Sequence, residues 1–300
     1  MNTATPRPDA GQLSSGTVYT LVAAAGFAAV SIFTTKAIAT GLTLATVLAW
    51  RFVIAAAVLT TFVGARGYPR IPPNEMLKFV AIGGFGQALL IYLALSALAY
   101  IPVATLAFLF YTYPAWVALT QTVRGAERLD RRRALALVLS FGGIGVMVGM
   151  PGAGTIDWRG VALALGAAIV YGIYIPVMRH LQGDHPVPPT SAYGKIGAAL
   201  AFLVMSVAQQ SFTYRLTPEA WLTIGALAVF STVLPGVLFT MGLVRLGPVR
   251  TAIVSTVEPF LTAVLGVLVL SQSLTVPTLV GGALVVSAVV VLQFKRERVA

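Results

Sequence analysis

Charged side chains are scarce in this chain of 300 residues. Lys and Arg number 20 and Asp and Glu only 9, so charged residues make up 10% of the sequence, against about 25% in a typical soluble domain. Apolar residues reach 58%, and the mean hydropathy is +0.89. So few polar side chains cannot cover the surface of a soluble fold of this size. The composition therefore predicts an integral membrane protein.

Cysteine is absent, which excludes disulfide bonds and thiolate metal ligands. Both histidines, His180 and His185, fall in one expected connection, and no aspartate lies centrally in an apolar run. We therefore expect no enzyme activity, no metal and no cofactor. The net charge of +11 does not indicate nucleic-acid binding, because the basic residues lie between apolar runs and not on one face or arm.

Long apolar runs are abundant, and runs of about 17 to 25 residues predict membrane-spanning helices. Ten are expected, at 17–38, 43–63, 74–98, 102–122, 133–150, 159–179, 188–209, 218–243, 248–270 and 275–294. Residues 1–16 and 295–300 are then polar tails. The predicted fold class is an all-α membrane protein with ten transmembrane helices around a central cavity.

Basic residues are distributed unequally over the expected connections. Three, Lys36, Arg159 and Arg215, fall on one side, whereas 14 fall on the other: Arg7, Arg66, Arg70, Arg124, Arg128, Arg131, Arg132, Arg133, Arg179, Arg245, Arg250, Lys295, Arg296 and Arg298. Cytoplasmic connections carry the excess of Lys and Arg. We therefore expect a multi-pass protein of the cytoplasmic (inner) membrane with both termini in the cytoplasm.

The chain also repeats itself weakly. A shift of 145 residues superposes Leu98 on Leu243, Ala107 on Ala252 and Pro114 on Pro259, and a shift of 144 superposes Arg51 on Lys195. Each half, 17–150 and 151–294, then holds five spans and enters the membrane from the opposite side. Such inverted repeats are typical of secondary transporters with alternating access. Pro114 and Pro259 are the predicted hinges.

These features resemble the drug/metabolite transporter superfamily in its EamA-type form. The resemblance rests on Tyr111-Thr112-Tyr113-Pro114, on Glu258-Pro259, on Arg51 as the family's basic residue in the second span, and on Glu127 near the end of the fourth span. Gln272 departs from the acidic counterpart of Glu127. Within the superfamily, the aromatic first half is similar to aromatic amino-acid exporters of the YddG type.

Glu258 is the leading candidate for a functional residue, because an ionisable group at membrane depth normally faces a cavity or a partner. Thr251, Ser255, Glu258 and Thr262 share one helix face. Glu258 can act as a proton-responsive or amine-binding carboxylate. Alternatively, it satisfies backbone groups loosened by Pro259 or holds a neighbouring arginine.

Aromatic side chains and a few polar ones complete the predicted substrate-binding site. Its members are Lys78, Phe85, Gln87, Tyr92, Phe110, Tyr111, Tyr113, Tyr171, Tyr174, Ser255 and Glu258. Rings can stack on an apolar substrate while Lys78 or a backbone dipole holds its carboxylate. The alternative for the tyrosines is packing or an interfacial belt, and Lys78 can instead reach the cytoplasmic surface. Arg51 and Lys195 are predicted to be structural intramembrane charges that bond a neighbouring helix.

The sequence therefore predicts a secondary transporter that exports small neutral metabolites, foremost aromatic or other apolar amino acids. Its partners are a small-molecule substrate and the lipid bilayer, with possible proton coupling. No oligomeric state is indicated. Two alternatives stay open: a phosphorylated-sugar or nucleotide-sugar exchanger, which would need several cavity-facing cations, and an assembly or lipid-handling subunit.

Overall fold

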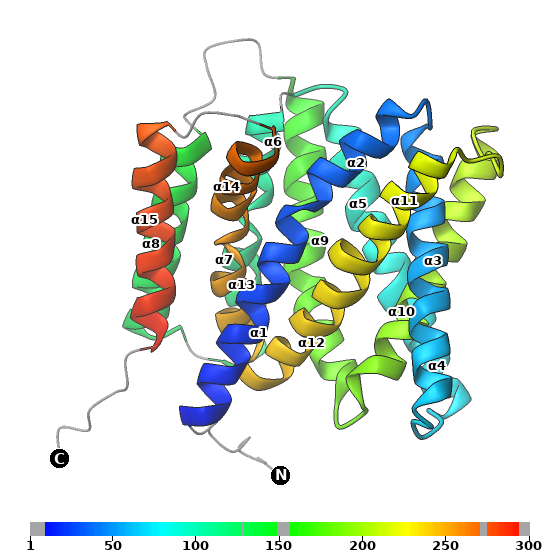
Figure 1. The fold of residues 1–300 in the computed structure, drawn as a ribbon. Coiled ribbons are helices and arrows are strands. Elements are labelled where there is room, and N and C mark those ends of the chain that lie inside the picture. Colours follow the sequence, from blue (N-terminus) through cyan, green and yellow to red (C-terminus); the bar gives the residue numbers. More distant parts are fainter. Residues whose placement is uncertain (1–9, 102, 128, 149–156, 271–274, 294–300) are drawn as a thin grey trace.

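The protein is a bundle of long helices, seen in a computed structural model that describes residues 10–101, 103–127, 129–148, 157–270 and 275–293 (Figure 1). The helices are α1 (Ala10–Ala28), α2 (Val30–Ala39), α3 (Leu44–Ala65), α4 (Pro73–Lys78), α5 (Gly86–Ala97), α6 (Val103–Phe110), α7 (Tyr113–Val123), α8 (Arg131–Val148), α9 (Trp158–Gln182), α10 (Val187–Ala208), α11 (Pro218–Ala228), α12 (Leu234–Leu246), α13 (Pro248–Ser255), α14 (Glu258–Leu270) and α15 (Val276–Gln293). Two π-helical segments, η1 (Phe79–Phe85) and η2 (Val229–Val233), join α4 to α5 and α11 to α12.

Seven helices in the described ranges are long and apolar enough to cross a membrane: Gly11–Ala39, Leu44–Ala65, Pro73–Ala97, Trp158–Gln182, Val187–Ala208, Pro218–Leu246 and Pro248–Val269. A shorter apolar helix covers Val276–Leu292. The chain is thus a multi-helix membrane protein, as its composition predicts. The spans expected at 102–122, 133–150 and 275–294 stay predictions. The first is broken into α6 and α7, and the second begins with three arginines.

Local signals explain where several helices begin and end. The side chains of Thr43, Asp157 and Thr217 accept hydrogen bonds from backbone amides in the first turns of α3, α9 and α11, which satisfies donors that have no partner within a helix. Gly183 and Gly247 have positive φ angles after α9 and α12, a conformation that glycine adopts without steric cost. Capping and glycine turns therefore separate successive spans.

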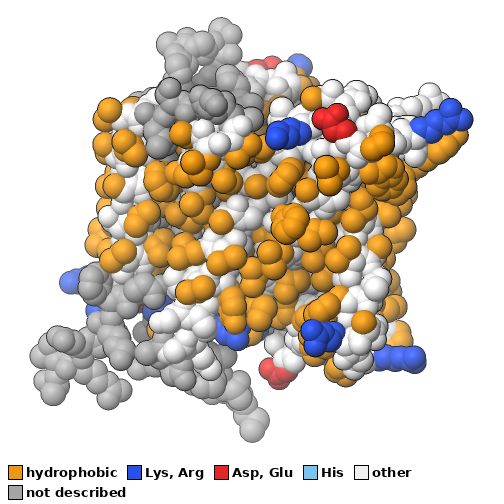
Figure 2. All heavy atoms as spheres, in the orientation of Figure 1, with side chains coloured by type: hydrophobic (Ala, Val, Ile, Leu, Met, Phe, Trp, Pro, Cys, Tyr) orange, Lys and Arg blue, Asp and Glu red, His pale blue; other side chains and the backbone are white. Residues whose placement is uncertain are grey.

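The outer surface of the bundle is apolar. In the face shown in Figure 2, hydrophobic side chains cover the middle of the molecule, and Lys, Arg, Asp and Glu gather towards the two ends. Many large hydrophobic side chains are exposed; Leu222, for example, is 77% exposed and Leu268 is 75% exposed. A soluble helix bundle rarely exposes so large an apolar surface. The exposed apolar belt is what a lipid environment requires.

Helices far apart in the sequence pack as pairs: α3 with α10, α8 with α15, α1 with α12, and α5 with α9 (Figure 1). Glycines allow some of these backbones to approach closely. Gly84 of η1 faces Gly197 of α10, and a Cβ at either position would collide with the backbone of the other segment. Small residues of this kind are how membrane helices pack without a hydrophobic driving force between them.

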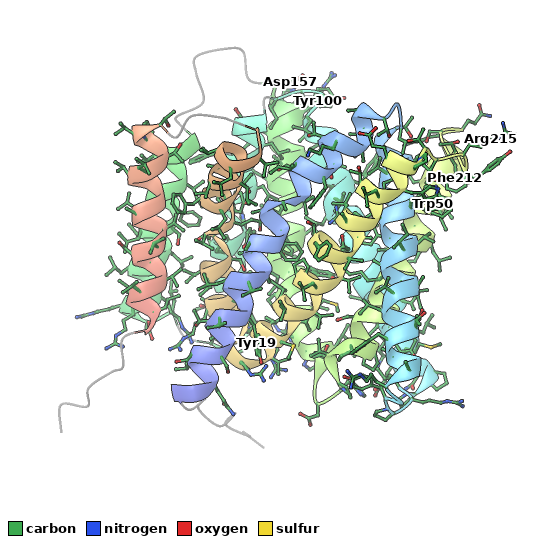
Figure 3. All side chains as sticks on the ribbon, viewed as in Figure 1. Tyr19, Trp50, Tyr100, Asp157, Phe212 and Arg215 are labelled. Carbon is green, nitrogen blue, oxygen red and sulfur yellow. The ribbon has the colours of Figure 1, made fainter. Side chains whose placement is uncertain are left out.

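Aromatic residues lie at the ends of the bundle. Trp50 and Phe212 lie close together near Arg215, at the same end as Tyr100, whereas Tyr19 lies towards the opposite end (Figure 3). The Trp50 indole Nε1 donates a hydrogen bond to the Thr213 carbonyl at 2.9 Å, and its ring stacks on Phe212 at 5.8 Å. Such placement suits aromatic side chains at a membrane–water boundary.

Candidate functional site

Two helices are interrupted just before a proline. α6 ends at Phe110 and α7 begins at Tyr113, with Pro114 as its second residue; α13 ends at Ser255 and α14 begins at Glu258, with Pro259 second. A proline has no amide hydrogen and its ring clashes with the carbonyl four residues earlier, so a helix cannot run through it regularly. At both breaks a threonine caps the preceding turn: Thr112 Oγ1 donates to the Leu109 carbonyl at 2.6 Å and Thr256 Oγ1 to the Ile253 carbonyl at 2.6 Å.

The breaks bring Glu258 next to tyrosines of both halves of the chain. The Tyr111 hydroxyl is hydrogen-bonded to the Glu258 carboxylate, and Tyr113 and Tyr171 lie within electrostatic reach of it. Tyr113 is fully buried, and its hydroxyl donates to the Ala252 carbonyl at 3.2 Å. An acidic residue of α14 is therefore surrounded by ring faces and hydroxyls of α7 and α9.

The three tyrosines near Glu258 belong to one group of rings, which we call the aromatic cluster: Phe110, Tyr111, Tyr113, Tyr171 and Tyr174. Tyr113 and Tyr171 have centroids 4.7 Å apart, Phe110 stacks on Tyr171 at 5.7 Å, and Tyr171 and Tyr174 are stacked at 6.3 Å. Ring faces carry partial negative charge. Together with the carboxylate they make a place suited to an organic cation such as an ammonium group.

The predicted polar face of α13 and α14 is largely satisfied within its own helix. Thr251 Oγ1, Ser255 Oγ and Thr262 Oγ1 each donate to the carbonyl four residues earlier, at 2.8, 2.9 and 3.0 Å. Ser255 also makes a side-chain hydrogen bond with Tyr113. Among the four residues of that face, Glu258 is the one whose side chain carries charge into the aromatic cluster.

The aromatic cluster continues to the third predicted span. Tyr174 donates its hydroxyl hydrogen to the Gly83 carbonyl of η1 at 2.9 Å. Four residues further on, Gln87 accepts a hydrogen bond from Lys195 Nζ at 2.9 Å. Gln87, Tyr174 and Lys195 therefore lie on connected faces of α5, α9 and α10.

Arg51 and Lys195 are both buried, at 7% and 9% exposure, and both bond to neighbouring helices. Arg51 Nε donates to Thr232 Oγ1 at 2.6 Å and its Nη2 to the Ser231 carbonyl at 3.3 Å. Both cations lie near the ring of Phe52: its centroid is 5.2 Å from the Arg51 Cζ and 5.5 Å from the Lys195 Nζ.

Three predicted site residues lie elsewhere. Lys78 is exposed, Phe85 is 54% exposed and Tyr92 is 52% exposed, so all three are more accessible than the tyrosines beside Glu258. Phe85 and Tyr92 line an outer apolar hollow of about 390 Å³ together with Phe202 and Met205. Their seven-residue spacing does place them on one face, but the opposite face, with its glycines, packs inwards against α10. The assignment of these three residues to the substrate-binding site stays a prediction.

Several contacts were not anticipated from the sequence. Thr232 and Ser231 of η2 hold Arg51, Phe52 lies beside both buried cations, and Thr256 Oγ1 donates to Ser140 Oγ at 3.1 Å. One signal was available: the shift of 145 residues that aligns the two prolines also aligns Gln87 with Thr232. The partners of the two buried cations thus occupy corresponding positions in the two halves.

Charged groups also meet at one end of the bundle. Glu127 Oε2 pairs with Arg133 Nη1 at 2.8 Å, and Glu127 Oε1 lies beside Gly247. His185 Nε2 lies 2.5 Å from Glu75 Oε2. Gln272 falls outside the described residues. Within the described part of the chain, no group of three or more His, Cys, Asp or Glu residues could hold a metal ion.

The sequence is similar to known transporters. Residues 14–149 and 158–294 each match the EamA-like transporter family. The threonine/homoserine exporter RhtA of Escherichia coli K12 is 31% identical over 66% of this chain and 64% of its own length. RhtA of Salmonella typhimurium LT2 is 37% identical over 40% of each chain. An uncharacterized transporter of Synechocystis is 29% identical over 75% of this chain and 69% of its own length.

The fold also matches a crystal structure of another protein with a TM-score of 0.80 at 19% identity, over 93% of this chain and 96% of the other. At that identity the likeness concerns the fold alone. The family match covers nearly all of the predicted spans and occurs once in each half. The chain therefore belongs to the EamA-like transporter family of the drug/metabolite transporter superfamily.

Proposed function

We propose that this protein exports small neutral amino acids across the cytoplasmic membrane by alternating access. The observation that carries the proposal is the Glu258 carboxylate, which is hydrogen-bonded to Tyr111 of the other half of the chain and lies near Tyr113 and Tyr171. A carboxylate among ring faces attracts the ammonium group that every amino acid carries. The exporters named RhtA supply the direction and the class of solute.

The proposed architecture is ten spans in two inverted halves, 17–150 and 151–294. The two separate family matches support it. The helix pairs support it as well: α1 packs on α12 as α9 packs on α5, so the first span meets the eighth as the sixth meets the third. Arg51 with Thr232 and Lys195 with Gln87 repeat the same relation at the level of side chains.

In this architecture the solute reaches Glu258 from either side of the membrane in turn. The helix breaks before Pro114 and Pro259 are the proposed hinges, because the backbone there lacks regular helical hydrogen bonds and can change direction at low cost. Rocking of one half against the other opens the aromatic cluster first to the cytoplasm and then to the outside.

Glu258 is also the proposed site of proton coupling. A carboxylate that holds the substrate's ammonium group must be ionised, and a proton that neutralises it releases the substrate. The same group can therefore bind a proton and a substrate alternately, but not together. Exchange of an outward-moving amino acid for an inward-moving proton follows from this competition.

Two kinds of neutral amino acid are the proposed substrates. The aromatic cluster favours aromatic or other apolar side chains, as predicted from the tyrosines, because rings stack on apolar bodies. The names of the similar exporters favour threonine and homoserine. Sugar phosphates receive less support, because a solute with two or more negative charges calls for several cavity-facing cations, and Arg51 and Lys195 are the two buried Lys or Arg side chains among the described residues.

The test is counterflow into liposomes that contain the purified protein. Vesicles are loaded in turn with phenylalanine, threonine, homoserine or glucose 6-phosphate, and uptake of the labelled solute is measured. We expect saturable uptake of at least one neutral amino acid and none of the sugar phosphate. If no neutral amino acid moves, the proposed function is wrong; if only the sugar phosphate moves, the protein is an exchanger of phosphorylated solutes instead.

A further inference from the structure

Arg51 and Lys195 are two cations inside the bundle that have no carboxylate partner among the described residues. They are close enough for Arg51 to repel Lys195 electrostatically, and both lie within 5.5 Å of the centre of the same Phe52 ring. Two unpaired positive charges at membrane depth are costly. Such a pair is stabilised by an anion placed between or beside them.

The hydrogen bonds of the two side chains leave donors unused. A guanidinium carries five N–H donors and an ammonium three. In the structure Arg51 donates to Thr232 Oγ1 and the Ser231 carbonyl, and Lys195 donates to Gln87 Oε1. All of these acceptors are neutral, so they orient the cations without neutralising them. The buried Ser231 Oγ has no hydrogen-bond partner and adds a further polar atom at this place.

The surroundings leave little freedom to the two cations. Phe52 is completely buried and stacks on Phe202 at 5.2 Å, so the ring that both cations approach is held in place. Gly236 of α12 lies alongside Lys195, since a Cβ at that position would be in van der Waals contact with Nζ at 3.5 Å. A preorganised pair of cations with unused donors and a small residue alongside has the composition of an anion site.

We propose that Arg51 and Lys195 form an anion subsite that binds the carboxylate of the transported solute. This deepens the proposed function and rests on it. The subsite adjoins the aromatic cluster through Tyr174, which bonds the Gly83 carbonyl four residues before Gln87. Each half contributes one cation, so an anion bound here contacts both halves. The proposal concerns the anionic end of the solute and does not require the same molecule to contact Glu258 at the same time.

The test separates the two ends of an amino acid. N-acetylphenylalanine keeps the carboxylate and lacks the ammonium group, whereas phenethylamine keeps the ammonium group and lacks the carboxylate. Thermal stability of the detergent-solubilised protein is measured with each compound at constant ionic strength, with sodium chloride as the reference anion and inorganic phosphate as a competing one. We expect N-acetylphenylalanine to raise the melting temperature of the natural protein more than chloride or phosphate does.

Variants then assign the effect to the subsite. Lys195→Gln should weaken the apparent affinity for N-acetylphenylalanine by about tenfold or more, because one charge-assisted hydrogen bond is lost, and leave phenethylamine unaffected. Lys195→Arg should restore anion binding. Lys36→Gln is the matched control, since Lys36 is exposed at the end of α2, and should behave like the natural protein.

Gln87→Glu keeps the proposal falsifiable if removal of a cation prevents folding. It places a carboxylate against Lys195 with almost no change in shape, so the internal anion should raise the melting temperature and abolish the response to N-acetylphenylalanine. Equal stabilisation of the natural protein by chloride, or a stronger response to phosphate than to the carboxylate, would overturn the proposal. The anion subsite is tested by melting temperature, whereas the proposed function is tested by counterflow. Either proposal can therefore be refuted while the other stands.

Discussion

At the scale of single residues, the environment of Glu258 decides its role. Its carboxylate is bonded by the Tyr111 hydroxyl and stands near Tyr113 and Tyr171, and no arginine or lysine among the described residues forms a salt bridge with it. The structure therefore does not support the alternative in which Glu258 holds a neighbouring arginine. A tyrosine hydroxyl stabilises the charge only in part, so the carboxylate is left able to attract a proton or an ammonium group.

Replacing Glu258 by glutamine tests this role. Glu258→Gln keeps the size of the side chain and removes its charge, so we expect counterflow of the amino acid to fall by about tenfold or more, the value of one hydrogen bond to a charged group. In the natural protein substrate binding should strengthen as the pH rises, because deprotonation creates the charge that holds the ammonium; in Glu258→Gln it should be flat. Initial rates between pH 5.5 and 8.5 give both results.

The matched control is Glu219→Gln, which removes an exposed carboxylate at the start of α11. It should retain the rate and pH dependence of the natural protein. If Glu258→Gln keeps both as well, neither the proton nor the amine role of Glu258 can stand.

At the scale of helices, irregular segments occur at corresponding places in the two halves. The π-helical segments η1 and η2 interrupt the helices 73–97 and 218–246, and breaks precede Pro114 and Pro259. π-helical turns often accompany functional sites. Here they border the partners of the buried cations: Thr232 lies in η2 and Gln87 is the second residue after η1. The irregular backbone segments therefore lie beside the polar side chains that bond the two buried cations.

The contact between η1 and α10 depends on glycine. A Cβ at Gly197 would collide with the Val80 carbonyl and approach Gly84 Cα to 2.9 Å, and both obstacles are backbone. We expect Gly197→Ala to destabilise the protein by about 1 to 3 kcal/mol, because the helices must move apart. Its melting temperature in detergent should fall by several degrees.

Gly225→Ala provides the control, because nothing lies within 4 Å of the Cβ position at Gly225. Alanine favours a helix over glycine by about 1 kcal/mol, so this variant should melt at or above the natural temperature. An unchanged melting temperature for Gly197→Ala would show that the close packing of η1 on α10 does not matter for stability.

At the scale of the whole molecule, the distribution of charged residues distinguishes the two ends of the bundle. α1 begins and α15 ends at the same end of the bundle (Figure 1), and Arg215 lies at the opposite end with Tyr100 and Asp157 (Figure 3). Arg245 lies over the Tyr19 ring at 4.6 Å, near the beginning of α1. The excess of arginine at this first end makes it the proposed cytoplasmic end.

The absence of cysteine makes the orientation directly testable, since a single introduced cysteine is the only one in the chain. Tyr214 is 70% exposed and Asp184 is exposed, and they lie in connections expected on opposite sides. In intact cells a membrane-impermeant maleimide should label Tyr214→Cys and leave Asp184→Cys unlabelled until the cells are broken. The reverse pattern would place the termini outside the cytoplasm.

Helical spacing anticipated part of the candidate site. Residues such as Tyr171 and Tyr174, or Ser255 and Glu258, share a face because they are three apart, and the structure does bring their faces towards one another. The same reasoning grouped Phe85 and Tyr92 on one face, and the structure leaves both side chains about half exposed. In a bilayer both the lipid-facing and the packed side of a helix are apolar, so composition does not distinguish inside from outside.

The sequence by itself determined that the chain lies in a membrane, that its fold is all-α, where prolines interrupt two helices, and which family it resembles. These properties follow from hydropathy, proline chemistry and local spacing. Only the tertiary structure decided which faces meet: that Tyr111 of the first half bonds Glu258 of the second, and that Arg51 and Lys195 share the ring of Phe52. These contacts join residues more than 100 positions apart, and no local rule of backbone geometry fixes such distances. They arise from how the two halves pack against each other.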